Sequence, residues 1–394
     1  MKKAYLDNAA TTQVDSRVLE AMLPFFRDKF GNPSSIYALG QESKKAIEEA
    51  RKKISSILGC KTREIIFTSC ATESNNLVLK GVIEAWSREH KGTPHIIVSP
   101  IEHHSVLDSV KHLEKEGLAE VTLLSVDKFG IVNPEEIRES IRENTVLVSV
   151  MYVNNEIGTI EPIKEIGRIC KEINVSRQLP IHFHTDAVQA IQYLDCSVQK
   201  LGVDFLSLAG HKLHAPKGIG LLFKKQGTPI IRQQDGGEQE FGLRAGTENV
   251  AYIIGLAKAL ELAEENKAQK AKMVTGLRDK LIEGVLKIGR VHLSGHPKKR
   301  IPHIASFVIE ETEGESMILL LDEFGIAASS GSACTSRILK PSYVLTAMKI
   351  PPELSHGSLR LSLSSETTEK EIDYVLEVLP KIIKKLRKMA PKNL

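Results

Sequence analysis

Short apolar runs alternate with longer segments of helical periodicity from about residue 64 to residue 223. The apolar runs have the length of strands, and the segments between them carry apolar residues at the spacing of an amphipathic helix. This alternation predicts an α/β fold, in which helices cover both faces of a mostly parallel sheet. Strands are expected at residues 64–68, 95–98, 120–124, 145–150, 180–186, 203–208 and 218–223.

The segments outside these strands predict the remaining elements. Helices are expected at Val14–Phe26, Ser43–Leu58, 69–89, Pro134–Arg142, Glu165–Asn174 and, as one or two helices, Ala251–Lys287. Strands and helices then alternate again, at Ile304–Ile309, Glu315–Phe324, near Ile326, Pro341–Met348, Ser358–Leu363 and Thr368–Lys388. Because 394 residues exceed one ordinary core, we expect a large domain at 13–262 and a smaller α/β domain at 1–12 and 263–394.

Polar residues fall at or just after the expected strand ends: Thr72, His103, Asn155, Asp186 and Lys212. In parallel α/β sheets, ligands bind outside the carboxyl ends of the strands. The sequence therefore predicts a binding site where these five residues meet.

Lys212 stands between two apolar runs, in the motif Gly210-His-Lys. Burying an ammonium group is costly, and a lysine whose pKa is lowered by its surroundings forms Schiff bases with carbonyls. Asp186 lies 26 residues earlier, at the end of another expected strand. Pyridoxal phosphate requires such a pair, because the lysine holds its aldehyde and the carboxylate keeps its ring nitrogen protonated. A surface lysine in a loop is the competing interpretation.

The turn Ser69–Asn75 carries small and hydroxyl residues between a strand and a helix. Such turns offer free backbone N–H groups and the positive end of the helix to a phosphate. Thr72 fits either a phosphate ligand or a plain N-cap.

Composition excludes several classes of protein. Charged residues make up 26% and hydrophobic residues 42% of the chain, as in soluble globular proteins, and a net charge of +4 gives no support for nucleic-acid binding. No apolar run reaches the about 18 residues of a membrane span, and no apolar signal core follows Met1. The five scattered cysteines form no CxxC pair, so we expect neither disulfides nor a metal site, and a cytoplasmic protein.

Cys334 is the cysteine with the least apolar surroundings. It lies in Ala328-Ser-Ser-Gly-Ser-Ala-Cys-Thr-Ser-Arg337, and a mobile loop is expected at about 328–340. Most free cysteines are buried packing residues, which suits Cys170 and Cys196 but not Cys334.

Three motifs carry a family resemblance: His184-Thr-Asp-Ala-Val-Gln-Ala190, Gly210-His-Lys212 and Ser329-Ser-Gly-Ser-Ala-Cys-Thr-Ser336. They resemble those of the NifS/IscS-type cysteine desulfurases, which are pyridoxal phosphate enzymes of fold type I, in the class-V aminotransferase group. The resemblance extends from Tyr5 to Asp373. It departs at Cys70, Ala209 and Glu238, where relatives usually have glycine, serine and glycine.

The resemblance implies a role for each motif residue. His103 would stack on the pyridoxal ring and move protons, Arg360 would clamp the substrate carboxylate together with Asn155, and Cys334 would take the sulfur. Residues expected at the cofactor are Lys212, Asp186, Gln189, His103, Asn155, Ala71, Thr72, His211 and, from the neighbouring subunit of a homodimer, Thr247.

The implied activity is removal of sulfur from L-cysteine, which yields L-alanine and a persulfide on Cys334. The persulfide sulfur would then pass to an acceptor protein, either an iron–sulfur scaffold or a thiolation enzyme. Three alternatives stay open: selenocysteine lyase on the same fold, another class-V enzyme such as an aminotransferase, and a catalytically silent binding partner.

Overall fold

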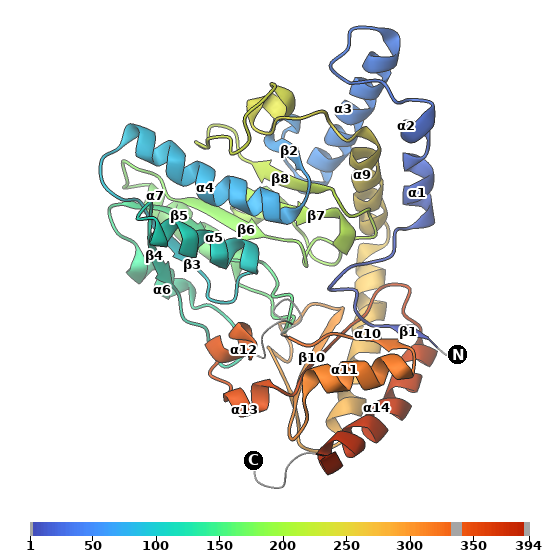
Figure 1. Cartoon of the computed structure of the whole chain (residues 1–394). Coiled ribbons are helices and arrows are strands. Elements are labelled where there is room, and N and C mark those ends of the chain that lie inside the picture. The colour runs from blue at the N-terminus through green and yellow to red at the C-terminus, as the bar shows by residue number, and fades with distance from the viewer. Residues whose placement is uncertain (1–2, 332–340, 390–394) are drawn as a thin grey trace.

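The computed structural model describes residues 3–331 and 341–389 of the chain. A seven-stranded sheet forms its centre, in the order β2-β8-β7-β6-β5-β3-β4 (Figure 1). Neighbouring strands are parallel except for β8, which runs antiparallel to both β2 and β7. The predicted α/β fold is therefore confirmed. The strands are β2 (Ile65–Thr68), β3 (His95–Val98), β4 (Glu120–Leu123), β5 (Thr145–Ser149), β6 (His182–Asp186), β7 (Phe205–Ala209) and β8 (Gly220–Lys224).

Helices cover both faces of this sheet because successive strand residues point to opposite sides. Ile96 and Val98 pack with α4 (Ala71–Glu89) and α5 (His104–Lys115), whereas Ile97 packs with the helices of the other face. Those helices are α1 (Ser16–Met22), α3 (Ala38–Leu58), α7 (Ile163–Asn174) and α9 (Val250–Glu264). Each face thus has its own apolar core.

Three local predictions differ from the structure. The helix expected at Val14–Phe26 is interrupted before α2 (Pro24–Arg27), because Pro24 has no N–H to continue the ladder. Helix α6 (Pro134–Ser140) ends earlier than expected, since Ile141 has extended backbone angles. Helix α5 was not predicted, although it directly follows His103.

A second sheet of three antiparallel strands lies below the large one in Figure 1, in the order β12-β10-β9. The N-terminal strand β1 pairs in parallel with β11, so the first residues pack with the C-terminal part, as predicted. The division into domains at residues 12 and 262 stays a prediction. The elements are β1 (Ala4–Tyr5), β9 (Val291–Leu293), β10 (Ile304–Ile309), β11 (Ile326–Ala327) and β12 (Ser358–Ser362).

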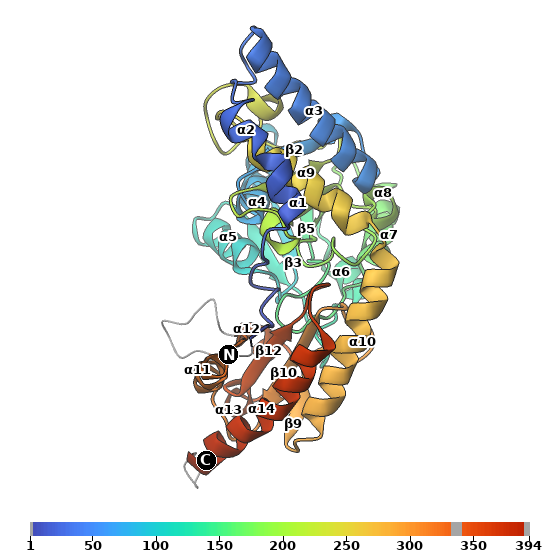
Figure 2. The ribbon, with the colours of Figure 1, turned by 90° about the vertical axis from the view of Figure 1, so that its right-hand side faces the viewer.

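Helices α10 (Lys267–Leu286) and α14 (Glu369–Met389) run side by side along this second sheet (Figure 2). Asn266, with φ of 53°, separates α9 from α10, so the long helical segment forms two helices. No helix within 3–331 and 341–389 is both long and apolar enough to cross a membrane. The remaining helices are α8 (Val198–Leu201), α11 (Gly314–Glu323), α12 (Tyr343–Ala347), α13 (Pro352–Ser355) and short 3-10 turns at 62–64, 210–212 and 239–242.

Candidate active site

The carboxyl ends of β2, β3, β5, β6 and β7 lie along one edge of the large sheet, because these strands share one direction. Each end leads directly to one of the predicted site residues. Thr72 and His103 begin the helices after β2 and β3, Asn155 follows β5, Asp186 ends β6 and Lys212 follows β7. The predicted clustering at strand ends is therefore what the topology produces.

Lys212 lies in the 3-10 turn after β7 and is partly buried. Its Nζ donates to the carbonyl oxygens of Ala9 and Ala10, at 2.6 and 2.5 Å. The N-terminal segment is tied to the same turn, since the Thr12 N–H donates to the His211 carbonyl at 2.9 Å. The amine is thus held against the segment between β1 and α1, in a partly buried turn.

Asp186 is connected to His103 through two buried side chains that the sequence reasoning missed. The Asn75 amide donates to Asp186 Oδ2 at 2.9 Å and to Ser105 Oγ at 2.8 Å. Ser105 Oγ is 2.9 Å from Nδ1 of His103, which also accepts from the Ser105 backbone N–H at 3.1 Å. The one signal in the sequence was an asparagine, Asn75, in the interior of a predicted helix, where this residue type is disfavoured. In the structure its side chain is fully buried.

These bonds fix the protonation of His103. Nδ1 accepts from a backbone N–H, so the neutral ring carries its proton on Nε2. Burial lowers the pKa of His103, the Asp186 carboxylate raises it, and the Lys212 ammonium lowers it. Since both charges act on this ring, the three groups share one site.

The first turn of α4 has the features of an anion site. Cys70 is the N-cap and no side chain caps the helix there, so the first backbone N–H groups lack a capping partner. Thr72 is exposed and is the second residue of the helix, which excludes the N-cap interpretation. His211 lies across the site, with Nδ1 at 3.2 Å from Thr11 Oγ1.

Arg360 is buried on β12 and points back toward the large sheet. Its guanidinium donates to the Asn155 carbonyl at 2.9 Å and pairs with Asp7 at 3.0 Å. Its Nε atom has no hydrogen-bond partner among the described residues. The side chain is therefore held by two segments of the site with donor capacity remaining, rather than lying on a surface strand.

Cys334 lies outside the described residues, but the chain that leads to it is placed. Ser329 exchanges backbone hydrogen bonds with Arg360, at 2.7 and 3.2 Å. After residue 340, where the described chain resumes, the Ser342 hydroxyl donates to buried Glu156 at 2.5 Å. Burial raises the pKa of Glu156 to about 7. The segment that contains the predicted nucleophile thus begins beside the predicted carboxylate clamp.

Thr247 is exposed on the segment between the last 3-10 turn and α9. Two ion pairs hold this segment. Buried Glu240 forms two hydrogen bonds with Arg51 of α3, at 2.9 and 3.0 Å, and Arg244 pairs with Glu73 of α4 at 2.9 Å. Glu73 also accepts from the Ser69 N–H at 2.7 Å, so Thr247 is linked to the anion-binding turn.

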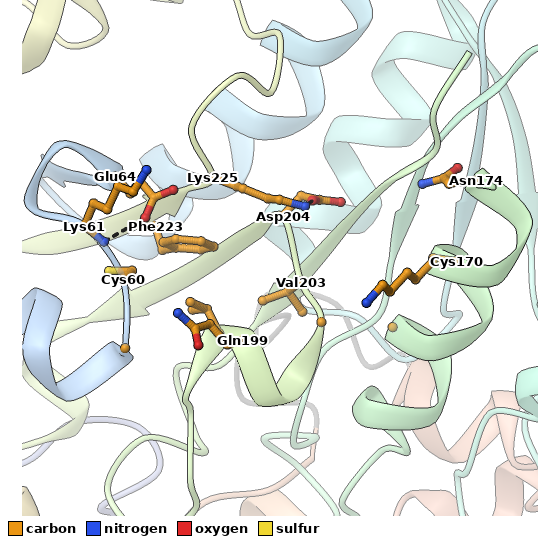
Figure 3. Close-up of a pocket in the computed structure, with 15 residues that line it drawn as sticks. Cys60, Lys61, Glu64, Cys170, Asn174, Gln199, Val203, Asp204, Phe223 and Lys225 are labelled. Atoms are coloured by element: carbon orange, nitrogen blue, oxygen red, sulfur yellow. Dashed lines mark hydrogen bonds and ion pairs between the residues drawn. The ribbon is translucent and has the colours of Figure 1, made fainter. Parts of the chain in front are cut away.

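Three of the other cysteines are poor nucleophiles. Burial raises the pKa of Cys60, Cys170 and Cys196 to about 12, which keeps each thiol protonated. Cys60 and Cys170 line a cavity of about 750 Å³, together with Val203 and Phe223 (Figure 3). This cavity lies at the amino ends of β2 and β7, the edge of the sheet opposite the candidate site.

The functional groups at this site match those that bind pyridoxal phosphate. The site combines an amine, a buried carboxylate oriented by an amide, a neutral imidazole and an uncapped helix N-terminus. An amine forms the link to an aldehyde, a carboxylate pairs with a pyridinium, and a helix N-terminus binds phosphate. Within 3–331 and 341–389, no group of three His, Cys, Asp or Glu side chains is placed to hold a metal ion.

Comparisons with known proteins show the family to which the chain is similar. Residues 4–375 match the family described as aminotransferase class-V. The chain is 52% identical over 390 residues to the cysteine desulfurase IscS of Methanosarcina thermophila, covering 99% of this chain and 94% of the relative. A solved NifS-like protein superposes with a TM-score of 0.90 at 40% identity, covering 97% of this chain and all of the other.

A structure of SspA in complex with cysteine also matches, with a TM-score of 0.80 and 33% identity over 93% of this chain and all of the other. The family resemblance predicted from the motifs is thus confirmed over nearly the whole sequence. The chain belongs to the cysteine desulfurases of the class-V aminotransferase family, whose cofactor is pyridoxal phosphate.

Proposed function

We propose that this protein removes sulfur from L-cysteine and yields L-alanine and a persulfide on Cys334. The observation that carries the proposal is the connected set of Lys212, Asp186 and His103 at one sheet edge, in a chain of this family. When bound, pyridoxal phosphate supplies an electron sink at the carbon next to the amino group.

Different residues of the chain bind different parts of the cofactor and the substrate. When pyridoxal phosphate is bound, Lys212 would hold its aldehyde carbon, Asp186 would pair with its ring nitrogen and His103 would stack on its ring. Its phosphate would be bound by Ala71, Thr72, His211 and the partner subunit's Thr247, and its ring oxygen by Gln189 and Asn155. Arg360 would then bind the substrate carboxylate, because the planar fork of a guanidinium matches two carboxylate oxygens.

Proton transfer falls to Lys212 and His103. Once substrate has displaced it, the Lys212 amine would take the proton from Cα. The neutral His103 ring carries its hydrogen on Nε2, because the Ser105 N–H holds Nδ1. Cys334 would form an S–S bond with the substrate sulfur as the Cβ–S bond breaks. Cβ would take up the proton that the Cys334 thiol gives up and become the methyl group of alanine, while the proton held by Lys212 would return to Cα.

A homodimer is part of the proposal, and an exposed apolar surface supports it. Six large apolar side chains lie exposed over α1, α2 and the chain that leads into α3: Leu19, Leu23, Phe26, Phe30, Ile36 and Tyr37. Apolar clusters of this kind mark protein interfaces. A second subunit would cover them and bring its Thr247 to this site. We also propose a cytoplasmic location and transfer of the sulfur to an iron–sulfur scaffold or a thiolation enzyme.

The test is formation of L-alanine and sulfide from L-cysteine, in the presence of a thiol reductant, by wild type and by Cys334→Ala. Loss of the nucleophile is expected to reduce alanine formation by on the order of 10³-fold or more. The matched control is Cys60→Ala, which removes a protonated thiol at the opposite sheet edge and should act like wild type.

Each alternative predicts a different result. An aminotransferase keeps full activity in Cys334→Ala, and a silent binding partner forms no alanine even as wild type. A selenocysteine lyase turns over selenocysteine much faster than cysteine. Any of these three outcomes contradicts the proposed function.

A further inference from the structure

The orientation of the Gln189 amide follows from its neighbours. Its Nε2 lies 3.0 Å from the carbonyl oxygen of Ala9, the oxygen that also accepts from Lys212. A carbonyl oxygen only accepts hydrogen bonds, so the NH2 group of Gln189 must be on this side. Its Oε1 therefore points the other way, into the protein.

Oε1 of Gln189 faces His303, which lies just before β10 in the second sheet. The distance to His303 Nε2 is 3.1 Å, and both side chains are buried. Because Oε1 only accepts, Nε2 must carry the hydrogen. His303 Nδ1 has no partner among the described residues, so a proton on Nδ1 would be buried without an acceptor. Burial also lowers the pKa of His303 to about 3, which keeps the ring neutral.

One stacked ring and two backbone contacts hold His303 in place. It stacks on Tyr193 with ring centroids 5.0 Å apart and planes inclined by 26°. Its carbonyl accepts from the Leu363 N–H at 2.8 Å, and two residues earlier the Ile301 carbonyl accepts from Arg278 at 2.8 Å. The donor therefore has one fixed position relative to Gln189.

We propose that His303 is a positioning residue of the active site: its Nε2–H holds the Gln189 amide with the NH2 group directed toward Lys212 and the cofactor. This inference rests on the proposed function, in which Gln189 donates to the ring oxygen of the cofactor. Without the His303 donor, only the Ala9 carbonyl holds the Gln189 amide. The NH2 group is then less firmly oriented, and its hydrogen bond to the ring oxygen weakens.

The first test reads the His303 tautomer directly and needs no cofactor. Nitrogen NMR of the full chain labelled with ¹⁵N-histidine should show one ring that is protonated on Nε2 and does not titrate between pH 5 and 9. The resonance is assigned by its loss in His303→Gln. A proton on Nδ1, or titration near pH 6.5, overturns the inference.

The second test measures the pH midpoint of the visible absorption band of the lysine-bound cofactor. A donor to the ring oxygen weakens the attraction of that oxygen for the neighbouring proton, so losing it raises the midpoint. We expect a rise of about 0.4 to 1 pH unit in His303→Leu and in Gln189→Leu, as for the loss of one hydrogen bond. The double variant should show no further rise, because both changes remove one interaction.

Two variants separate positioning from a purely structural role. His303→Gln keeps a donor at a similar reach and should restore the wild-type midpoint. His292→Leu changes an exposed histidine on β9 and should leave the midpoint unchanged. If His303→Leu binds the cofactor with the wild-type midpoint, His303 is structural only. If wild type forms no alanine, the proposed function fails, whereas the NMR result still decides the His303 tautomer.

Discussion

Replacing Asp186 by alanine is expected to reduce alanine formation from L-cysteine by about 10³-fold, while the protein stays folded. The reason is that the electron sink requires a protonated ring nitrogen, and Asp186 is the buried carboxylate that the site offers for it. Its two oxygens are already oriented by the Val188 N–H at 3.0 Å and the Asn75 amide at 2.9 Å. Steady-state turnover of L-cysteine gives the measurement.

Asp195→Ala is the matched control, because this exposed carboxylate bonds to nearby Ser197 and Lys200, so its loss should leave turnover unchanged. The absorption spectrum of Asp186→Ala should still show the lysine-bound cofactor, since Lys212 is intact. Turnover of Asp186→Ala within tenfold of wild type would contradict the assignment of the ring nitrogen to this residue.

Glu240→Ala is expected to lower the free energy of unfolding by about 3 to 5 kcal/mol, because it leaves the buried Arg51 guanidinium with only the half-exposed Glu48, at 3.5 Å, as an ion-pair partner. The side chains of Arg51 and Glu240 are only 4% and 3% exposed. Arg51 also lies between the rings of Phe67 and Phe241, at 4.7 and 5.0 Å. Urea unfolding at a fixed protein concentration measures the difference.

The effect should be specific to the buried carboxylate. Glu238→Ala, two residues earlier and 86% exposed, is expected to change stability by about 0.5 kcal/mol or less. Glu240 and Phe241 both have positive φ angles, of 47° and 60°, so the ion pair also holds a strained turn. A loss below about 1 kcal/mol in Glu240→Ala would show that Arg51 finds another partner.

The sheet and the clustering of Lys212, Asp186 and His103 could be predicted because they depend on local patterns. Strand length, apolar runs and the parallel direction place strand ends at one edge, and the motif residues follow those ends. The ladder registers confirm this arrangement for β5, β6 and β7. The family motifs added residues such as Arg360, whose place at the site no periodicity indicates.

The contacts that orient these residues could not be predicted, because each joins distant parts of the chain. Asn75 and Ser105 look like ordinary helical residues until α4 and α5 pack side by side over β6. Gln189 follows β6 and His303 precedes β10, 114 positions later, so the two side chains meet only in the folded chain. The role of Thr247 stays a prediction, because it depends on a second subunit and not on the fold of this chain.

The most direct test of the central claim is the absorption spectrum of the purified protein with pyridoxal phosphate, recorded before and after L-cysteine is added. Lys212→Ala should lose the band of the lysine-bound cofactor and at least about 10³-fold in alanine formation, because one amine both holds the cofactor and moves a proton. Lys217→Ala, an exposed lysine nearby, should match wild type in both respects. The account predicts a visible band in wild type that changes with L-cysteine as alanine appears; a colourless wild type that cannot bind pyridoxal phosphate would contradict it.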